Sequence, residues 1–370
     1  MAGFRSLGLV ARGVLAGLAF LVNATSLAWP PSWGPEFTFS NPELTAARNE
    51  VLKSDRDQVA WKKYRDLQEG HNARLFGLYE ARCAREPQCR VRYLDRTDPQ
   101  GVYPIRVEYE DGFWFQVLSD PAVKEVITKP STRIEFRERK ALLQADIFDV
   151  MAEAGLRPEE SFGGGHLNLG VASTFDGNAT FARDAYVDFE NNRWLFDGVL
   201  GFAGNRNGRA VAELDANAQA AVSAAIARFD QEPATSLEDF IRSLSEALLR
   251  DGDTWAYDRK KQFAVSLRDQ VWELRNVLPQ RNVDVFLAQL ETLEGRLDFN
   301  RQRKTRVKLE AFAKTDLNPE ALGQRYANYF REMGRAPTPE QIALAPFSLP
   351  ADTGAPGCLG ALRRLFTRKP

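Results

Sequence analysis

The sequence has little of what usually marks a nucleic-acid-binding protein or an enzyme of a familiar class. Its 370 residues carry a formal net charge of only −1, so no overall field favours nucleic acid or an anionic membrane. It has no G-x-S-x-G, Walker loop, H-E-x-x-H or dinucleotide-binding fingerprint. Histidine occurs twice and cysteine three times, without the spacing of a zinc finger or a redox pair. The chemistry must therefore be sought in patterns along the chain.

Long hydrophobic runs are scarce as well. The uncharged run at residues 13–28 follows Arg5 and Arg12 and contains sixteen residues, fewer than the roughly 20 that span a bilayer. It ends in Ser26-Leu27-Ala28, with small residues at the positions that a signal peptidase reads. Residues 1–28 are therefore predicted to be an export signal, with an uncleaved membrane anchor as the alternative. After cleavage we expect a periplasmic or secreted protein without a stable membrane span.

The few cysteines leave two readings open. Cys83 and Cys89 are six positions apart and can close a small disulfide loop at the end of a helix in an oxidising compartment, which leaves Cys358 unpaired. Free thiols at a helix end are the alternative.

What the sequence does contain is a mixture of strand and helix patterns. Hydrophobic residues make up 44% and charged residues 27% of the chain, as in soluble globular proteins. Alternating segments predict strands at residues 36–40, 91–93, 105–109, 113–117, 122–130, 166–171, 263–267 and 270–277. Helices are predicted at residues 41–86, 134–154, 178–189, 209–230, 236–250, 280–312 and 319–333, and residues 194–202 are ambiguous.

This order predicts an α+β fold, in which a curved, mainly antiparallel sheet lines a cleft and packs against long helices. The domain is expected to span residues 29–340, and residues 341–370 are expected to be a flexible basic tail. His71, beside Gly70 and Asn72 in a charged helix, is expected at the surface.

The segment from Phe162 to Val171 combines three glycines with a short alternating stretch. Because side chains alternate between the faces of a strand, His166 and Asn168 should share one face, and Leu167 and Leu169 the other. Such a strand suits a sheet with one face on helices and the other on a cleft. A glycine-rich turn before an ordinary strand is the alternative.

Three other predicted strands carry an acid on the face opposite their large apolar residues. These acids are Glu36, Glu125 in DPAVKEVITKP, and Glu273 in VWELR, where Arg275 lies on the same face as Glu273. For any single strand, a solvated polar face is the simpler interpretation. The four motifs in this order, with GGGHLNLG as the third, resemble the glutamine synthetase-like carboxylate–amine ligases, particularly their amidoligase-type branch. The resemblance covers roughly residues 34–300.

The resemblance implies a glutamine synthetase-like catalytic domain that uses ATP and Mg²⁺ or Mn²⁺ to join a carboxylate to an amine through an acyl phosphate. Hard oxygen ligands with one imidazole suit these ions, so the implied metal ligands are Glu36, Glu125, His166 and Glu273, with Glu108 as a further candidate. Arg275 and Glu273 are implied as catalytic residues, and Arg275 and Asn168 as cofactor-binding residues. Two positions depart from the family pattern, since Thr38 replaces an acid and Asn168 a histidine.

The implied partners are a small-molecule or peptide carboxylate and an amine donor, and no nucleic acid. Because ATP is scarce outside the cytoplasm, an export signal favours an alternative function. In that alternative, the protein is an exported, non-catalytic domain of the same fold that binds a peptide, cell-wall material or another protein.

Overall fold

The computed structural model describes most of the chain between residues 30 and 346. The described ranges are 30–54, 57–85, 88–159, 165–201, 208–232, 234–252, 263–268, 270–312, 314–316 and 318–346. The predicted export signal (1–28), Cys358 and most of the predicted basic tail lie outside them. Within these ranges, no helix is both long and apolar enough to cross a membrane.

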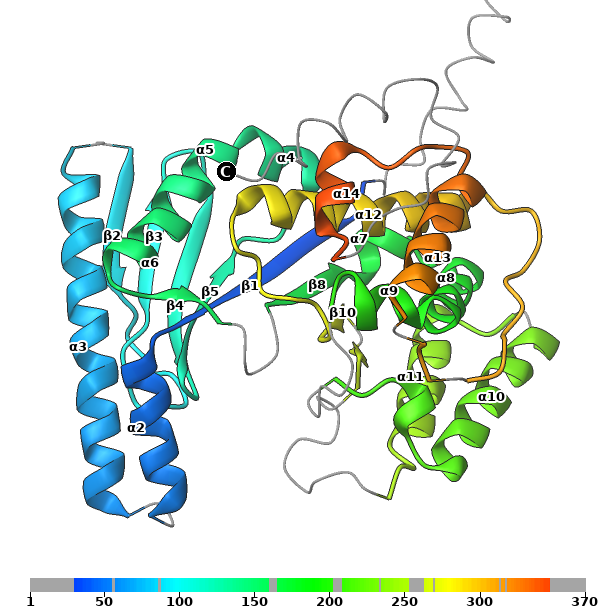
Figure 1. The fold of residues 1–370 in the computed structure, drawn as a ribbon, viewed down its shortest axis with the longest axis horizontal. Helices are drawn as coiled ribbons and strands as arrows, with labels where there is room; N and C mark the ends of the chain where they lie inside the picture. The colour runs from blue at the N-terminus through cyan, green and yellow to red at the C-terminus, as the bar shows by residue number, and fades with distance from the viewer. Residues whose placement is uncertain are drawn as a thin grey trace, which may run out of the picture.

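One open antiparallel sheet runs through the molecule, as the sequence predicts. Its strands follow the spatial order β2-β3-β4-β5-β1-β8-β10-β9, and two short strands, β6 and β7, pair with β1. The strands are β1 Ser32–Ser40, β2 Cys89–Tyr93, β3 Ile105–Tyr109, β4 Trp114–Asp120, β5 Val123–Thr128, β6 Ser131–Thr132, β7 Arg157–Pro158, β8 His166–Gly170, β9 Val265–Leu267 and β10 Val271–Leu274. The central strand β1 runs diagonally through the fold (Figure 1) and pairs with β5 on one side and β8 on the other.

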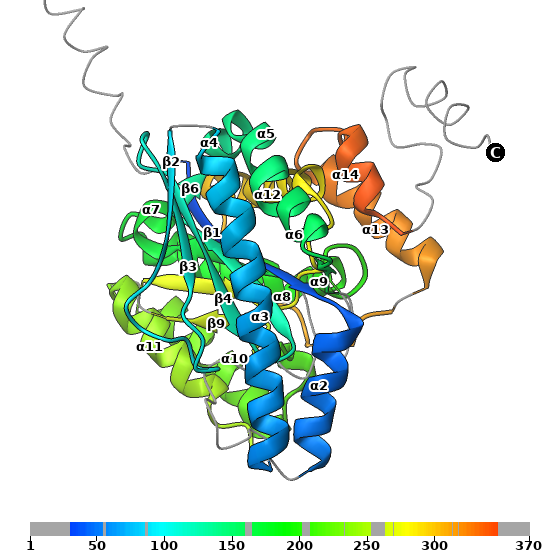
Figure 2. The ribbon, with the colours of Figure 1, turned by 90° about the vertical axis from the view of Figure 1, so that its left-hand side faces the viewer.

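Helices flank this sheet at both ends and along one face (Figures 1 and 2). They are α2 Pro42–Lys53, α3 Gln58–Cys83, α4 Arg133–Glu138, α5 Lys140–Leu143, α6 Val150–Glu153, α7 Val171–Phe175, α8 Ala179–Asn191, α9 Arg193–Gly198, α10 Ala216–Gln231, α11 Leu237–Leu248, α12 Val283–Gln302, α13 Pro319–Glu332 and α14 Pro339–Leu344. A π-helical stretch, Gln144–Asp149, joins α5 to α6, and a 3-10 turn, Val211–Glu213, precedes α10.

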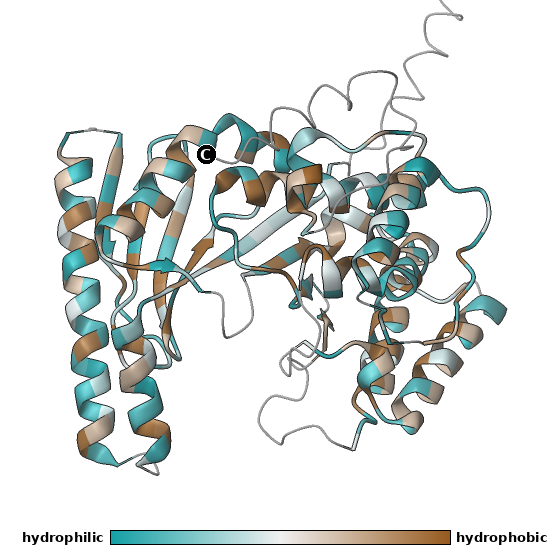
Figure 3. Ribbon diagram, in the orientation of Figure 1, coloured by the Kyte–Doolittle hydropathy of each residue, from teal (hydrophilic) through white to brown (hydrophobic). Residues whose placement is uncertain are grey.

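The core lies against one face of the sheet, to which most of the alternate strand residues contribute apolar side chains. Trp33 and Phe37 in β1 and Trp272 in β10 are fully buried. The Phe37 ring lies 5.2 Å from Phe148 of the π-helical stretch and 5.1 Å from Phe286 of α12. In α2 and α3, hydrophobic residues alternate with hydrophilic ones (Figure 3). In each strand, the buried apolar residues determine which face packs against the helices. The polar residues of the strand therefore lie on the opposite face.

Several helix boundaries differ from those expected. The single helix expected at 41–86 is two helices, because the side chain of Asp57 caps a new helix by accepting from the amides of Val59 and Ala60. The helix expected from residue 209 starts at Ala216, where Asp215 caps it. The first residues of the expected tail belong to α14, and Gln341 there is fully buried.

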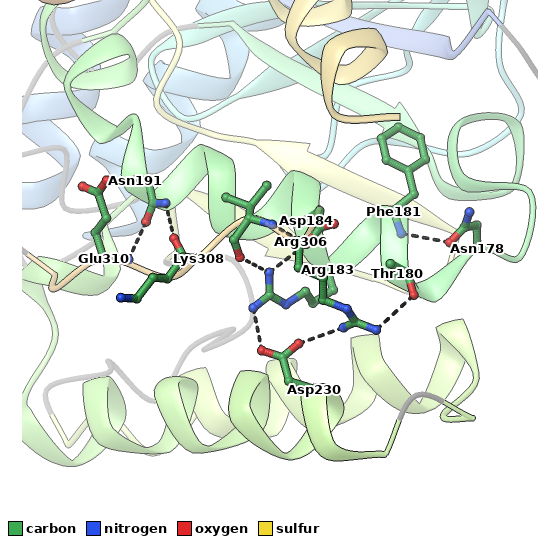
Figure 4. A network of polar contacts seen from close by, with 11 residues as sticks. Asn178, Thr180, Phe181, Arg183, Asp184, Asn191, Asp230, Arg306, Lys308 and Glu310 are labelled. Carbon is green, nitrogen blue, oxygen red and sulfur yellow. Dashed lines mark hydrogen bonds and ion pairs between the residues drawn. The ribbon is translucent and has the colours of Figure 1, made fainter. Parts of the chain in front are cut away.

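The helix expected at 280–312 is also shorter, since α12 ends at Gln302. Beyond it, backbone groups bind side chains of α8 instead of the preceding helical turn. The amide of Val307 donates to Asp184, and the amide of Glu310 donates to Asn191. Asp230 of α10 pairs with Arg183 and Arg306, so this segment is joined to both helices (Figure 4).

Two smaller expectations are resolved at α3. A disulfide bond joins Cys83, the last residue of this helix, to Cys89, the first residue of β2. His71, which was expected at the surface, is half-buried there, and its Nε2 lies 3.4 Å from Asn41 Nδ2 at the start of α2.

Candidate metal site

The pairing of β1, β8 and β10 brings four of the expected site residues together. Glu36 of β1 lies opposite His166 of β8. On the other side of β8, Asn168 lies opposite Glu273 of β10. Paired residues in an antiparallel sheet project from the same face. All four side chains therefore lie on the polar face, opposite the buried Phe37 and its apolar neighbours.

The polar groups are in direct contact. His166 Nδ1 lies 2.8 Å from Glu36 Oε2 and 3.1 Å from Glu273 Oε1. Asn168 donates its side-chain amide to Glu36 Oε1 at 2.7 Å. The side chain of Glu273 is 3% exposed, whereas those of Glu36 and His166 are 19% and 18% exposed. The cluster is thus anchored in the interior at Glu273 and open toward solvent at Glu36.

Two arginines complete the surroundings of Glu273. Arg275, the residue after the end of β10, pairs with Oε1 of Glu273, and Arg268 lies 2.5 Å from Oε2. Arg275 is an expected site residue. Arg268 was not expected in the site. It belongs to the turn between β9 and β10, and its contact with Glu273 depends on the folding of this hairpin.

The ionisation of the cluster follows from these contacts. Burial disfavours the charged ring of His166, but hydrogen bonds to Glu273 and Glu36 outweigh it and raise the pKa of His166 to about 9. Burial also opposes the charge on Glu273, yet the hydrogen bond from His166 and the charge of Arg275 lower its pKa to about 2. At neutral pH, an imidazolium therefore lies between the carboxyl groups of Glu36 and Glu273.

Glu125 lies on the same face, but on β5 and two residues away from the position opposite Glu36. It is opposite Thr38, not Glu36, and it is not part of the group formed by Glu36, His166 and Glu273. Burial, followed by the charge of Glu36, raises the pKa of Glu125 to about 8. Of the four expected ligands, the structure therefore brings three together and places the fourth beside them as a neutral carboxyl group.

A further acid near Thr38 is one that the sequence analysis missed. The amide of Glu159 donates to the carbonyl of Thr38, which continues the pairing of β7 with β1 and places Glu159 on the polar face. Both residues are buried, and the Thr38 hydroxyl has no hydrogen-bond partner within the described ranges. A strand of only two residues, β7, gives no alternation from which this position is predictable.

Glu108, the additional candidate ligand, does not belong to the cluster. It lies on β3, and three strands, β4, β5 and β1, lie between β3 and β8 in the sheet. Its carboxylate contacts Arg106 at 2.9 Å and Arg92 at 3.4 Å.

The glycine that leads into β8 has a specific steric role. A Cβ atom on Gly165 would lie 2.3 Å from Gln280 Oε1 and 2.5 Å from the carbonyl oxygen of Glu36. Only glycine allows the backbone to come this close to β1. Residues 160–164, including the other two glycines, lie outside the described ranges.

The donor set suits a hard divalent cation. Glu36, His166 and Glu273 each offer one ligand atom, and these three atoms lie within 4.8 Å of one another. Two carboxylates and one imidazole fit Mg²⁺ or Mn²⁺. The His166 ring occupies the position between the two acids, where a cation would bind after the ring loses its proton.

No family model and no curated protein matches this chain. The resemblance to carboxylate–amine ligases therefore depends on the residues of the four motifs alone.

Proposed function

We propose that this protein is an ATP- and Mg²⁺- or Mn²⁺-dependent ligase that joins a carboxylate to an amine through an acyl phosphate. One observation carries the proposal. Glu36, His166 and Glu273 come from three strands that are distant in the sequence, and they converge on one face of the sheet with Arg268 and Arg275 beside them. Separate solvated faces would not produce this convergence.

The residues of the cluster divide the work between them. Glu36, His166 and Glu273 would hold the divalent ion, which supplies charge neutralisation for the nucleotide phosphates. Arg275 and Arg268 offer planar guanidinium groups, which suit phosphate and carboxylate oxygens. Asn168 is a positioning residue, because its amide fixes the carboxylate of Glu36.

Glu125 is suited to proton transfer. Its pKa of about 8 is close to the working pH, where a general base is most effective. An amine donor arrives as an ammonium ion and must lose a proton before it can attack. We assign the ionised form of Glu125, beside the cluster on the same face, to accept that proton and become the neutral carboxyl group.

A second candidate function is an exported binding domain of the same fold. It is favoured by the pairing of Glu273, because both of its carboxylate oxygens already contact arginine side chains. The Cys83–Cys89 disulfide also fits an oxidising compartment, as does the export signal proposed for residues 1–28. In this alternative, the cluster is a structural ion-pair network.

The two functions are separated by measuring ADP release from the purified chain, with Mg²⁺ or Mn²⁺ and a pool of amino acids and acidic peptides. For the ligase we expect release that depends on both the cation and an added acceptor, and a loss of about 10²–10³-fold in Glu36→Gln. Arg306→Gln, which removes an exposed ion pair with Asp230 away from the cluster, is the matched control and should retain wild-type turnover. An absence of acceptor-dependent ADP release would favour the binding domain.

A further inference from the structure

The polar face continues from the cluster across the sheet to its β2 edge. Pairing connects Glu36 to Ile127, Ile127 to Gln116, Gln116 to Arg106, and Arg106 to Arg92. These residues form one row perpendicular to the strands, with all side chains on the same face. The row joins the cluster of Glu36, His166 and Glu273 to a group of arginines at the opposite end.

Positive charge predominates at that end. On this face, β2 and β3 carry three arginines and one acid, which are Arg90, Arg92, Arg106 and Glu108. The single carboxylate of Glu108 contacts both Arg92 and Arg106, so one negative charge is shared between two guanidinium groups. The net charge of the four side chains is +2, from three positive and one negative. This differs from the whole chain, whose net charge is −1.

Arg106 is held in a fixed position. Its guanidinium carbon lies 3.9 Å from the centre of the Trp114 ring, and its side chain is 18% exposed. Stacking on an aromatic ring leaves the N–H groups at the edge of the guanidinium plane free to meet carboxylates. The side chain of Arg92 is 52% exposed, and Arg90 is also exposed. This end of the face is therefore open to a ligand.

We propose that this arginine face, defined as Arg90, Arg92 and Arg106, binds an extended acidic peptide that lies across the strands toward the cluster. Three strand spacings of about 4.8 Å separate Arg106 from Glu36, or roughly 14 Å, and four separate Arg92 from it, or roughly 19 Å. An extended chain advances about 3.3 Å per residue. The acidic side chains that meet the arginines are thus about four to six residues from the carboxylate at the cluster.

Charge complementarity identifies the occupant as an acidic peptide. Arginine pairs bidentately with carboxylates, and neutral Gln116 and Ile127 line the path between the two ends. As a substrate assignment, this inference rests on the proposed ligase function, because the peptide carboxylate at the cluster would be the one joined to an amine. As a binding assignment, it stands on the arginine face alone.

The test measures the binding of fluorescein-labelled hexaglutamate to the full chain by fluorescence anisotropy, without nucleotide or divalent ion. We expect saturable binding that weakens as salt rises, at least tenfold weaker binding in Arg92→Gln/Arg106→Gln, and tighter binding in Glu108→Gln. The double variant Arg90→Gln/Arg92→Gln changes only exposed side chains. It should show the same weakening, and it replaces the first double variant if the latter does not fold. Arg242→Gln, which removes an exposed arginine paired with Asp239 on α11, should bind like the wild type.

Several outcomes would overturn the inference. These are hexaglutamate binding that is absent at low salt, binding that is unchanged in both double variants, and equally tight binding of hexaglutamine. A six-nucleotide oligothymidine that binds as tightly, with the same loss in the variants, would identify a general polyanion surface and overturn the peptide assignment. Hexaglutamate binding without ADP release would support the arginine face and refute the ligase. Acceptor-dependent ADP release without hexaglutamate binding would support the ligase and refute the arginine face.

Discussion

His166 and Glu36 are direct neighbours in the β1–β8 ladder, and Nδ1 of the histidine lies 2.8 Å from Oε2 of the glutamate. Glu273 approaches the same nitrogen from β10. Nδ1 of His166 is thus in contact with two carboxylates, one from each neighbouring strand. His166 and Glu36 are 130 residues apart in the sequence. The sheet therefore creates a small site of alternating charge that no single segment of the chain contains.

The first prediction concerns Arg275, whose side chain is 12% exposed and pairs with the nearly buried Glu273. An arginine that served only catalysis would be expendable for folding. Here its removal leaves a buried carboxylate with one partner fewer, so we expect Arg275→Ala to lower the free energy of unfolding by about 3–5 kcal/mol. Urea denaturation measures this, and Arg306→Ala, an exposed pair, should cost less than about 1 kcal/mol. Equal losses in the two variants would show that Glu273 does not depend on Arg275.

Alternation along the strands made the polar face predictable from the sequence. The placement of Glu36, His166 and Glu273 on one face followed from the apolar residues between them, such as Phe37 and Trp272, which had to be buried. The convergence of these strands was an expectation from the resemblance, and the pairing of β1 with β8 and of β8 with β10 confirms the shared face.

Other features depended on contacts that local patterns do not contain. Arg268 reaches Glu273 across a hairpin, and Glu159 joins the face through a two-residue strand. The end of α12 at Gln302 was not predictable, because the backbone beyond it is bonded to side chains of α8, more than 100 residues earlier. In each case a partner that is distant in the sequence determines the local structure.

A second prediction concerns Gly165, where an added Cβ would lie too close to both Gln280 and the backbone of Glu36. The backbone of a central strand cannot move without disturbing its neighbours. We therefore expect Gly165→Ala to destabilise the fold by about 1–3 kcal/mol, as overpacking does, and to reduce any activity of the cluster. Gly70→Ala is the matched control, since nothing lies within 4 Å of its added Cβ in α3 and alanine favours helix. A thermal melt in which both variants behave alike would contradict this steric role.

The disulfide supports a third prediction. Cys83 and Cys89 are separated by six positions, so the bond closes a short loop. By lowering the entropy of the unfolded chain, it should raise the free energy of unfolding by about 2 kcal/mol. We expect Cys83→Ser/Cys89→Ser to lose about that much stability. Wild-type protein treated with a reductant should be as stable as this double variant. The midpoint of urea denaturation measures the loss. An unchanged midpoint in the double variant would show that the bond does not stabilise the fold.

The last prediction concerns Lys124, which is fully buried on the apolar side of β5. Its ammonium group donates to Asn72 Oδ1 at 2.6 Å, Ser119 Oγ at 2.7 Å and the carbonyl of Gln68 at 3.0 Å, and so connects α3 to the sheet. Burial lowers the pKa of Lys124 to about 7, although the charge of Asp98 opposes this. Between pH 7 and the ordinary lysine pKa of 10.5, the unfolded chain therefore binds a proton that the folded chain has released.

Because the unfolded state binds more protons in this window, the contribution of Lys124 to stability rises with pH, by up to about 1.4 kcal/mol per unit. His166 and Glu125, whose pKa values are raised to about 9 and about 8, give the opposite slope over part of the same window. Lys124→Met is therefore the reference, since both groups are unchanged in it and cancel in the difference. Urea denaturation at pH 7.5, 8.5 and 9.5 should show the wild type gaining stability relative to Lys124→Met at each step. A constant difference would mean that the lysine stays charged in the fold, held by its three acceptors and Asp98.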